Sequence, residues 1–66
     1  MTVSINGEER ELAQETTVTD FLTAKGLQPQ MVVVEYNGNI VARDNYQATR
    51  IEAGDTLEIV QMMAGG

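Results

Sequence analysis

The chain has 66 residues, of which 42% are hydrophobic and 21% are charged, fractions that are typical of one folded domain and leave no material for a second core. The absence of cysteine and histidine excludes disulfides, thiolate and imidazole metal ligands, thiol nucleophiles and the commonest general base. The net charge of −6 disfavours nucleic acid and anionic membranes as ligands and favours a basic protein partner.

The first segment of the sequence, residues 1–13, predicts a β-hairpin. Val3 and Ile5 alternate with polar residues, which is the period of a strand with one buried face. Asn6-Gly7 is a strong signal for a tight hairpin turn. The return strand, Glu8 to Ala13, is rich in charge, so we expect it at the edge of a sheet.

Residues 17–27 predict a helix with a signal at each end. Thr17 can cap the first turn while Asp20 reaches back to it. Gly26 can adopt the left-handed conformation that ends a helix, which would place Leu27 against Leu22. The face expected to lie on a sheet consists of Val18, Phe21, Leu22 and the stem of Lys25.

The second half of the sequence predicts three further strands. Met31 to Tyr36 is β-branched and reads as an interior strand, followed by an Asn37-Gly38 turn into Ile40 to Ala42. Residues 43–48 indicate a loop or a short helical turn, residues 49–51 a brief strand, and residues 53–55 a turn. In the last strand, Thr56 to Met62, Leu57 and Ile59 face one way and Glu58, Val60 and Met62 the other.

The order of these elements predicts an α+β fold of the β-grasp, or ubiquitin-like, type. Four or five strands would form a mixed sheet with one main helix packed across one face. Because the helix supplies a long crossover, the first and last strands can lie parallel beside each other. We expect residues 1–62 to form this domain and residues 63–66 to form a flexible tail that ends on Gly-Gly.

The last two residues, Gly65 and Gly66, point to a function for the tail. A segment without side chains can enter a narrow channel and present its terminal carboxylate to a nucleotide phosphate. A carboxylate is a poor electrophile and must first be converted to an acyl-adenylate. The sequence contains no phosphate-binding glycine loop, no obvious magnesium site and no general base, so a partner must supply the ATP chemistry. The residues therefore indicate a substrate or carrier rather than an enzyme.

A series of short motifs along the chain carries a family resemblance. The motifs are Asn6-Gly7, Thr17 to Leu22, Val33-Val34-Glu35 with Asn37-Gly38, Ile40-Val41 with Arg43, Gly54-Asp55 with Leu57 to Val60, and Gly65-Gly66. In order and spacing, over essentially the whole chain, they resemble the ThiS family of bacterial sulfur carriers in thiamine biosynthesis.

The resemblance implies a role for each residue of the tail. Gly66 would be adenylated by a ubiquitin-activating-like adenylyltransferase that uses ATP with magnesium. It would then become a thiocarboxylate, with sulfur from a cysteine desulfurase or another donor, and pass that sulfur to thiazole synthase. Gly65, Ala64 and Met63 would thread into the partners' active sites. The chain itself would bind no cofactor or metal and contribute no catalytic residue.

The sequence departs from the family pattern at two places. Many members have tryptophan where this chain has Tyr46 and proline where it has Ala42. Many have valine or glycine near the end, where this chain has Met62, Met63 and Ala64. These differences leave the chemistry intact, but they leave open which partner surface is matched.

The outward side of the last strand is a candidate docking surface. If the strand packs its other side on the helix, Val60 and Met62 emerge near Val33 and Glu35 of the neighbouring strand. Methionine is unbranched and adapts to more than one partner, so one face could serve two enzymes in turn. The alternative is that these are ordinary scattered apolar residues on a surface.

The charged residues have simpler interpretations. We interpret the acidic residues as a solvated surface, a few of which steer docking. Lys25 is expected as a cation at a helix end and Arg43 in a loop salt bridge.

Several alternatives remain open at the level of the sequence. The small subunit of molybdopterin synthase shares the fold and chemistry but is usually longer, and a ubiquitin-like modifier would join the same adenylate to lysines. A β-grasp binding module with an inert tail belongs to another class. We expect a monomer, because the tail must enter other proteins. We also expect no signal peptide, no membrane span and a cytoplasmic location.

Overall fold

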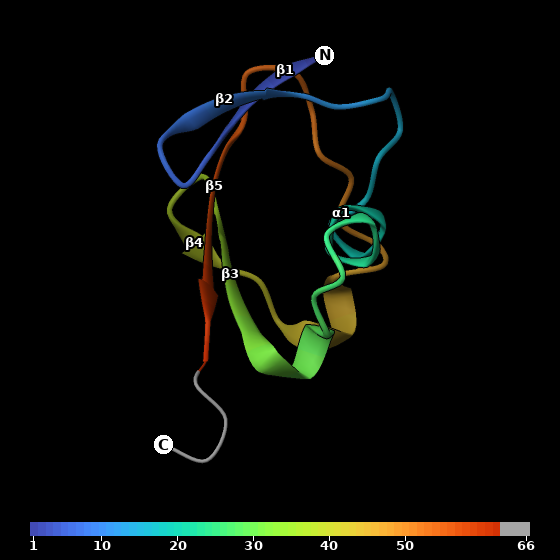
Figure 1. The fold of residues 1–66 in the computed structure, drawn as a ribbon, viewed down its shortest axis with the longest axis vertical. Helices are drawn as coiled ribbons and strands as arrows, with labels where there is room; N and C mark the ends of the chain where they lie inside the picture. Colours follow the sequence, from blue (N-terminus) through green and yellow to red (C-terminus); the bar gives the residue numbers. More distant parts are fainter. Residues whose placement is uncertain (63–66) are drawn as a thin grey trace.

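The computed structural model describes residues 1–62, which form a five-stranded sheet with one α-helix across one face (Figure 1). The elements in chain order are β1 (Thr2–Ile5), β2 (Glu8–Glu11), α1 (Val18–Ala24), the 3-10 helix η1 (Pro29–Met31), β3 (Val32–Tyr36), β4 (Asn39–Ile40), the 3-10 helix η2 (Arg43–Asn45) and β5 (Thr56–Gln61). The expected tail, residues 63–66, lies outside the described part of the chain.

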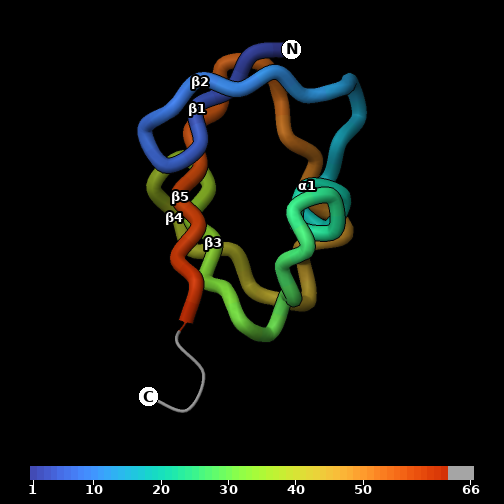
Figure 2. Tube along the Cα trace, viewed as in Figure 1, coloured from blue at the N-terminus to red at the C-terminus, as the bar shows by residue number. Residues whose placement is uncertain are grey.

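The sheet has the strand order β2-β1-β5-β3-β4. β1 and β5 are parallel, with Ser4 opposite Thr56, and the other neighbouring strands are antiparallel. The tube trace in Figure 2 follows the chain from β2 across to α1 and back to β3, which is the crossover that parallel pairing requires. The predicted β-grasp fold, including the parallel first and last strands, is confirmed.

Both hairpin turns have the predicted geometry. Asn6 and Gly7 have φ values of 54° and 81°, and Asn37 and Gly38 have values of 50° and 87°. Positive φ at both central residues defines the type I′ turn, whose twist matches that of the flanking strands.

Five strand predictions were too long. β2 ends at Glu11 instead of residue 13, and β4 pairs only at Asn39–Ile40, because both strands are at sheet edges and the chain leaves them to reach α1 and η2. The predicted strand at residues 49–51 is a single bridge between Thr17 and Arg50.

The fourth strand that was predicted too long is the one expected to begin at Met31. Pro29 instead starts η1, which includes Met31, so β3 begins one residue later. β5 stops at Gln61, although the Met62 N–H still donates to the Met31 carbonyl at 2.7 Å.

Helix α1 has the predicted cap at each end. At its start the Asp20 N–H donates to Thr17 Oγ1 at 3.0 Å, and the Thr17 N–H donates to Asp20 Oδ2 at 3.1 Å. At its end Gly26 has a φ of 71°, and the Leu27 N–H donates to the Leu22 carbonyl at 2.9 Å. These are the capping box and the Schellman motif, so the helix length is encoded locally.

The hydrophobic core lies between α1 and the facing side of the sheet. It consists of Val3, Ile5, Val18, Phe21, Leu22, Val32, Val34, Tyr46, Ile51, Leu57 and Ile59. Tyr46 and Ile51 come from the connection between β4 and β5, and the Tyr46 hydroxyl donates to the Val32 carbonyl at 3.2 Å. The core therefore closes with a loop as well as with the helix. No helix within residues 1–62 has the length and apolar character needed to cross a bilayer.

Candidate functional site: the outer sheet face and the end of β5

The side of the sheet opposite α1 carries an exposed apolar cluster. Val60 is 56% exposed, Met62 40% and Ile40 71%. Val33 lies directly opposite Val60 in the β3–β5 register, and Ile40 lies opposite Glu35 in the β3–β4 register. Residues directly opposite each other share a face, so three strands contribute to one surface. We call Val33, Ile40 and Val60, together with Met62 just beyond the end of β5, the outer-face patch.

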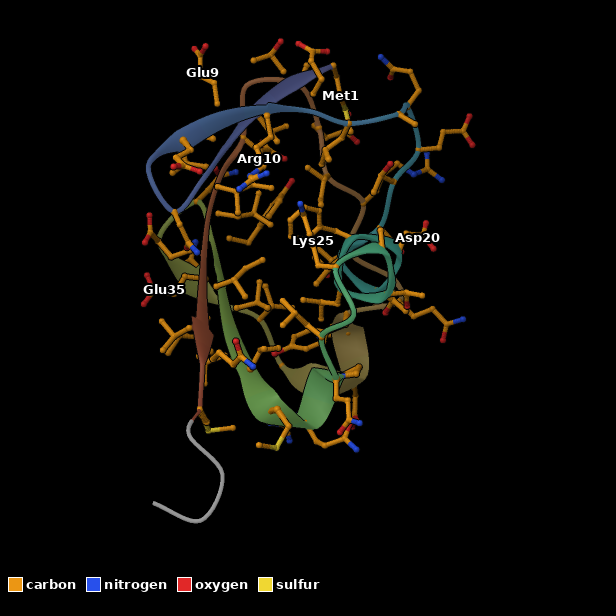
Figure 3. All side chains as sticks on the ribbon, in the orientation of Figure 1. Met1, Glu9, Arg10, Asp20, Lys25 and Glu35 are labelled. Atoms are coloured by element: carbon orange, nitrogen blue, oxygen red, sulfur yellow. The ribbon has the colours of Figure 1, made fainter. Side chains whose placement is uncertain are left out.

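Acidic side chains border the outer-face patch. Glu35 lies opposite Glu58, next to the Val33–Val60 pair along the same two strands. In Figure 3 the Glu35 side chain points away from the sheet on the side opposite α1. The patch therefore combines apolar area with negative charge, a combination suited to a partner that has apolar and basic groups.

The structure brings together three of the four residues that the sequence singled out for docking. Val33, Glu35 and Val60 share one side of the sheet, as the strand alternation predicted, and Met62 follows directly after the end of β5. Sequence reasoning missed Ile40, although the Asn37-Gly38 turn fixes the register and sets Ile40 opposite Glu35. The predicted tail residues, Met63, Ala64, Gly65 and Gly66, lie outside the described residues.

The strand that leads to the tail is held along its length. The Asn6 side chain accepts a hydrogen bond from the Ile59 N–H at 2.7 Å and donates to the Ile59 carbonyl at 3.2 Å. The Asn37 side chain accepts from the Thr56 N–H at 2.9 Å. Both hairpin turns thus add side-chain bonds to β5, a role that the Asn-Gly signal alone did not reveal.

A hydrogen-bonded cluster around the Asp55 carboxylate fixes the start of β5. The Asp55 carboxylate accepts hydrogen bonds from the Tyr36 hydroxyl, from the Glu52 N–H at 2.7 Å and from Asn37 Nδ2 at 3.2 Å. Partial burial opposes ionisation of Asp55, but these hydrogen bonds outweigh it and lower the pKa of the carboxyl. The hydrogen bond to Asp55, with partial burial, raises the pKa of Tyr36 to about 12. The cluster lies at the opposite end of β5 from Met62 and ties the start of the strand to Tyr36, Asn37 and Glu52.

Within residues 1–62, Arg43 does not form the expected salt bridge. Its Nε donates to the Pro29 carbonyl at 3.0 Å, and a terminal nitrogen lies 3.5 Å from the Gln30 carbonyl. The guanidinium therefore joins η2 to the carbonyls of η1, where its planar set of donors is well suited. No group of three or more side chains suited to a metal ion occurs in residues 1–62.

Comparison with known proteins identifies the family of this chain. A model of the ThiS family matches residues 3–66. The chain belongs to the ThiS family. The sulfur carrier protein ThiS of Bacillus subtilis is 29% identical over 65 residues, covering 97% of this chain and 98% of that protein. A crystal structure of the thiamine biosynthesis protein ThiS from Geobacter metallireducens has a TM-score of 0.84 and 33% identity, with full coverage of both chains.

Two thiazole synthases contain a segment similar to this chain. The protein from Paramagnetospirillum magneticum is 39% identical over 66 residues, and that from Magnetococcus marinus is 33% identical over 66 residues. Each alignment covers 100% of this chain and 20% of the synthase. The chain therefore spans about a fifth of the length of these relatives.

Proposed function

We propose that this ThiS-family chain is a sulfur carrier in thiamine biosynthesis, with the Gly66 carboxylate as the group that carries sulfur. The observation that supports this most strongly is the family match, which runs through the Gly65-Gly66 end. A relative of nearly the same length is named a sulfur carrier. In this role the chain is the substrate of its partners, as the family match and the name of that relative indicate.

The proposed chemistry proceeds in three steps at the Gly66 carboxyl. A ubiquitin-activating-like adenylyltransferase transfers AMP from ATP, with magnesium, to a carboxylate oxygen and releases pyrophosphate. The terminal sulfur of a persulfide, formed by a cysteine desulfurase or another donor, then attacks the carbonyl carbon, and AMP leaves. A thiol cleaves the acyl disulfide so formed, which gives the thiocarboxylate and a disulfide. The resulting thiocarboxylate donates sulfur to thiazole synthase. The synthases with a segment similar to this chain support that acceptor, since carrier-like and synthase parts there belong to one protein.

The intact mass of the protein tests the carrier role. Full-length protein and a version lacking Gly66 would be incubated with a lysate of the protein's own cells, ATP and a sulfur source. We expect a gain equal to one oxygen exchanged for one sulfur, in the full-length protein only. No gain, with ATP and desulfurase activity verified, would refute the proposal. Conjugates of higher mass would then indicate a protein modifier.

We propose further that the outer-face patch docks the activating enzyme and the acceptor in turn. The patch supplies apolar area beside the strand end from which the chain continues toward Gly66. A partner that covers the patch would also receive the tail. Its acidic border favours a basic partner, so association should slow as salt rises.

The matched variants Val60→Asp and Thr56→Asp test the docking surface. Both add one negative charge to the exposed side of β5, but only Val60 belongs to the outer-face patch. A central apolar contact is worth about 2 kcal/mol, so Val60→Asp should lower the kcat/KM of adenylation about thirtyfold. Thr56→Asp should change it little. Equal adenylation by Val60→Asp and wild type, with both folded, would contradict docking at this face.

A further inference from the structure

A second surface lies on the other side of the sheet, between the β1–β2 hairpin and α1. A pocket of about 470 Å³ opens there, which is within the size range of sites that bind small groups. Its floor is apolar, because Ile5, Phe21 and Ile59 from the core reach it. We call this site the hairpin pocket.

Two of the chain's four basic residues line the hairpin pocket. Arg10 lies opposite Val3 in the β1–β2 register, so it is on the core-facing side of an edge strand. Lys25 is the C-cap residue of α1. Figure 3 shows both side chains reaching into the space between β2 and α1, from opposite sides. A chain with a net charge of −6 thus concentrates positive charge at this place.

The positive charge of the hairpin pocket is only partly neutralised. Arg10 forms an ion pair with Glu8 at 3.1 Å. Lys25 has no ion pair within residues 1–62, and its Nζ lies 5.9 Å from the centre of the Phe21 ring. An inward charge on an edge strand also discourages aggregation, but that role needs Arg10 alone and does not account for Lys25. The arrangement favours an anion near both cations.

We propose that the hairpin pocket binds an acidic segment of a partner protein. A carboxylate of that segment pairs with Lys25 and Arg10, and a neighbouring large apolar side chain contacts the floor at Phe21. The rim residues Glu8, Lys25 and Gln61 are exposed, so the pocket is open. A free small ligand needs a site that encloses most of its surface, whereas a bound protein segment is shielded from water by the rest of its own protein.

The hairpin pocket and the outer-face patch have opposite character. The outer-face patch is apolar with an acidic border, and the hairpin pocket is apolar with two basic residues and one acidic residue, Glu8, in its lining. They lie on opposite sides of the sheet. A basic protein on one side and an acidic protein on the other can therefore be bound at the same time. This assignment uses no property of Gly66 and does not depend on the carrier chemistry.

The test is a titration of the ¹⁵N-labelled protein, followed by amide chemical shifts. The probe is the peptide N-acetyl-Gly-Ser-Phe-Glu-Ser-Gly-amide, which represents a protein segment, and the matched control has glutamine in place of glutamate. We expect the glutamate probe to shift amides around the hairpin pocket and to bind about fivefold more tightly than the control, in a salt-dependent manner. Equal binding of the two probes, or no binding of either, would overturn the proposal.

Two charge-removing variants locate the site. Lys25→Gln removes the cation without an ion pair, and Arg50→Gln removes an exposed cation outside the hairpin pocket. Lys25→Gln should weaken the glutamate probe about fivefold, while Arg50→Gln leaves its affinity unchanged. An equal loss in both variants would show general attraction to net charge and refute a specific site. The dispersion of the amide spectrum verifies that each variant is folded.

Discussion

Replacing Asn6 should reveal how strongly the first hairpin turn secures β5. Asn6 has a left-handed backbone, with φ of 54°, and its side chain makes both bonds to Ile59 of β5. Asn6→Ala removes the two side-chain bonds and places a residue with a Cβ in the left-handed region. Asn6→Gly removes the same bonds but tolerates that conformation. The pair of variants therefore separates side-chain bonding from backbone strain.

The magnitude follows from these two terms. Two partly buried hydrogen bonds contribute about 0.5 to 1.5 kcal/mol each, and alanine in the left-handed region costs about 1 kcal/mol more than asparagine or glycine. Asn6→Ala should then lower the free energy of unfolding by about 2 to 4 kcal/mol, and Asn6→Gly by about 1 to 3 kcal/mol. Domains of this size are stable by only about 3 to 10 kcal/mol, so the loss is a large share.

Urea unfolding followed by far-ultraviolet circular dichroism is the suitable assay, because the chain has no tryptophan. Asn6→Asp keeps the acceptor for the Ile59 N–H and loses the donor to its carbonyl, so its stability should fall between wild type and Asn6→Ala. A change below about 0.5 kcal/mol for Asn6→Ala would refute the reasoning, since that is the level of an ordinary surface substitution.

Three further predictions concern stability. Tyr36→Phe should cost about 1.5 kcal/mol at neutral pH, because Asp55 loses a hydrogen bond. Because the pKa of Tyr36 is raised, the contribution of this hydrogen bond is complete below the ordinary pKa of 10.0 and is lost as the pH rises towards about 12. Because the pKa of Asp55 is lowered, the same contribution is complete above pH 3.8 and is lost as the pH falls further. The thermal unfolding curves of variant and wild type should therefore converge at both pH extremes. A constant difference across pH would contradict the pairing. Gly26→Ala should cost about 1 kcal/mol in urea unfolding, since its φ is 71° and an added Cβ meets no atom within 4 Å; a much larger loss would imply a clash. Tyr46→Phe leaves the buried Val32 carbonyl without its side-chain donor and should lower the melting temperature by about 4 to 8 °C, measured by circular dichroism, and an unchanged temperature would show that the bond contributes nothing.

The parts of the fold that local chemistry determines could be predicted from the sequence. The Asn-Gly turns, the cap at Thr17 and the glycine cap at Gly26 each depend on residues within a few positions of one another. The strand alternation of β5 then assigned Glu58 and Val60 to the side opposite the core. Sequence and structure agree there, because the period of a strand fixes which face a residue takes.

The features that the sequence did not reveal depend on contacts between distant segments. Tyr46 lies in a polar stretch without periodicity, and its burial arises only when the β4–β5 connection folds over the core. Arg43 finds the Pro29 carbonyl, 14 positions away in the chain, instead of a carboxylate. The hairpin pocket likewise requires Arg10 and Lys25 to approach across the β2–α1 connection. No local sequence pattern encodes such contacts between distant residues.

β5 connects these observations to the proposed carrier role. The strand lies between β1 and β3 in the middle of the sheet, and the Asp55 cluster holds its start. Asn6 holds its centre at Ile59, and the Met62 N–H bonds to the Met31 carbonyl just beyond its end. A carrier must present its terminal group to different enzymes from a defined origin, since misplacement of reacting atoms is costly. Support along the whole of β5 provides that origin.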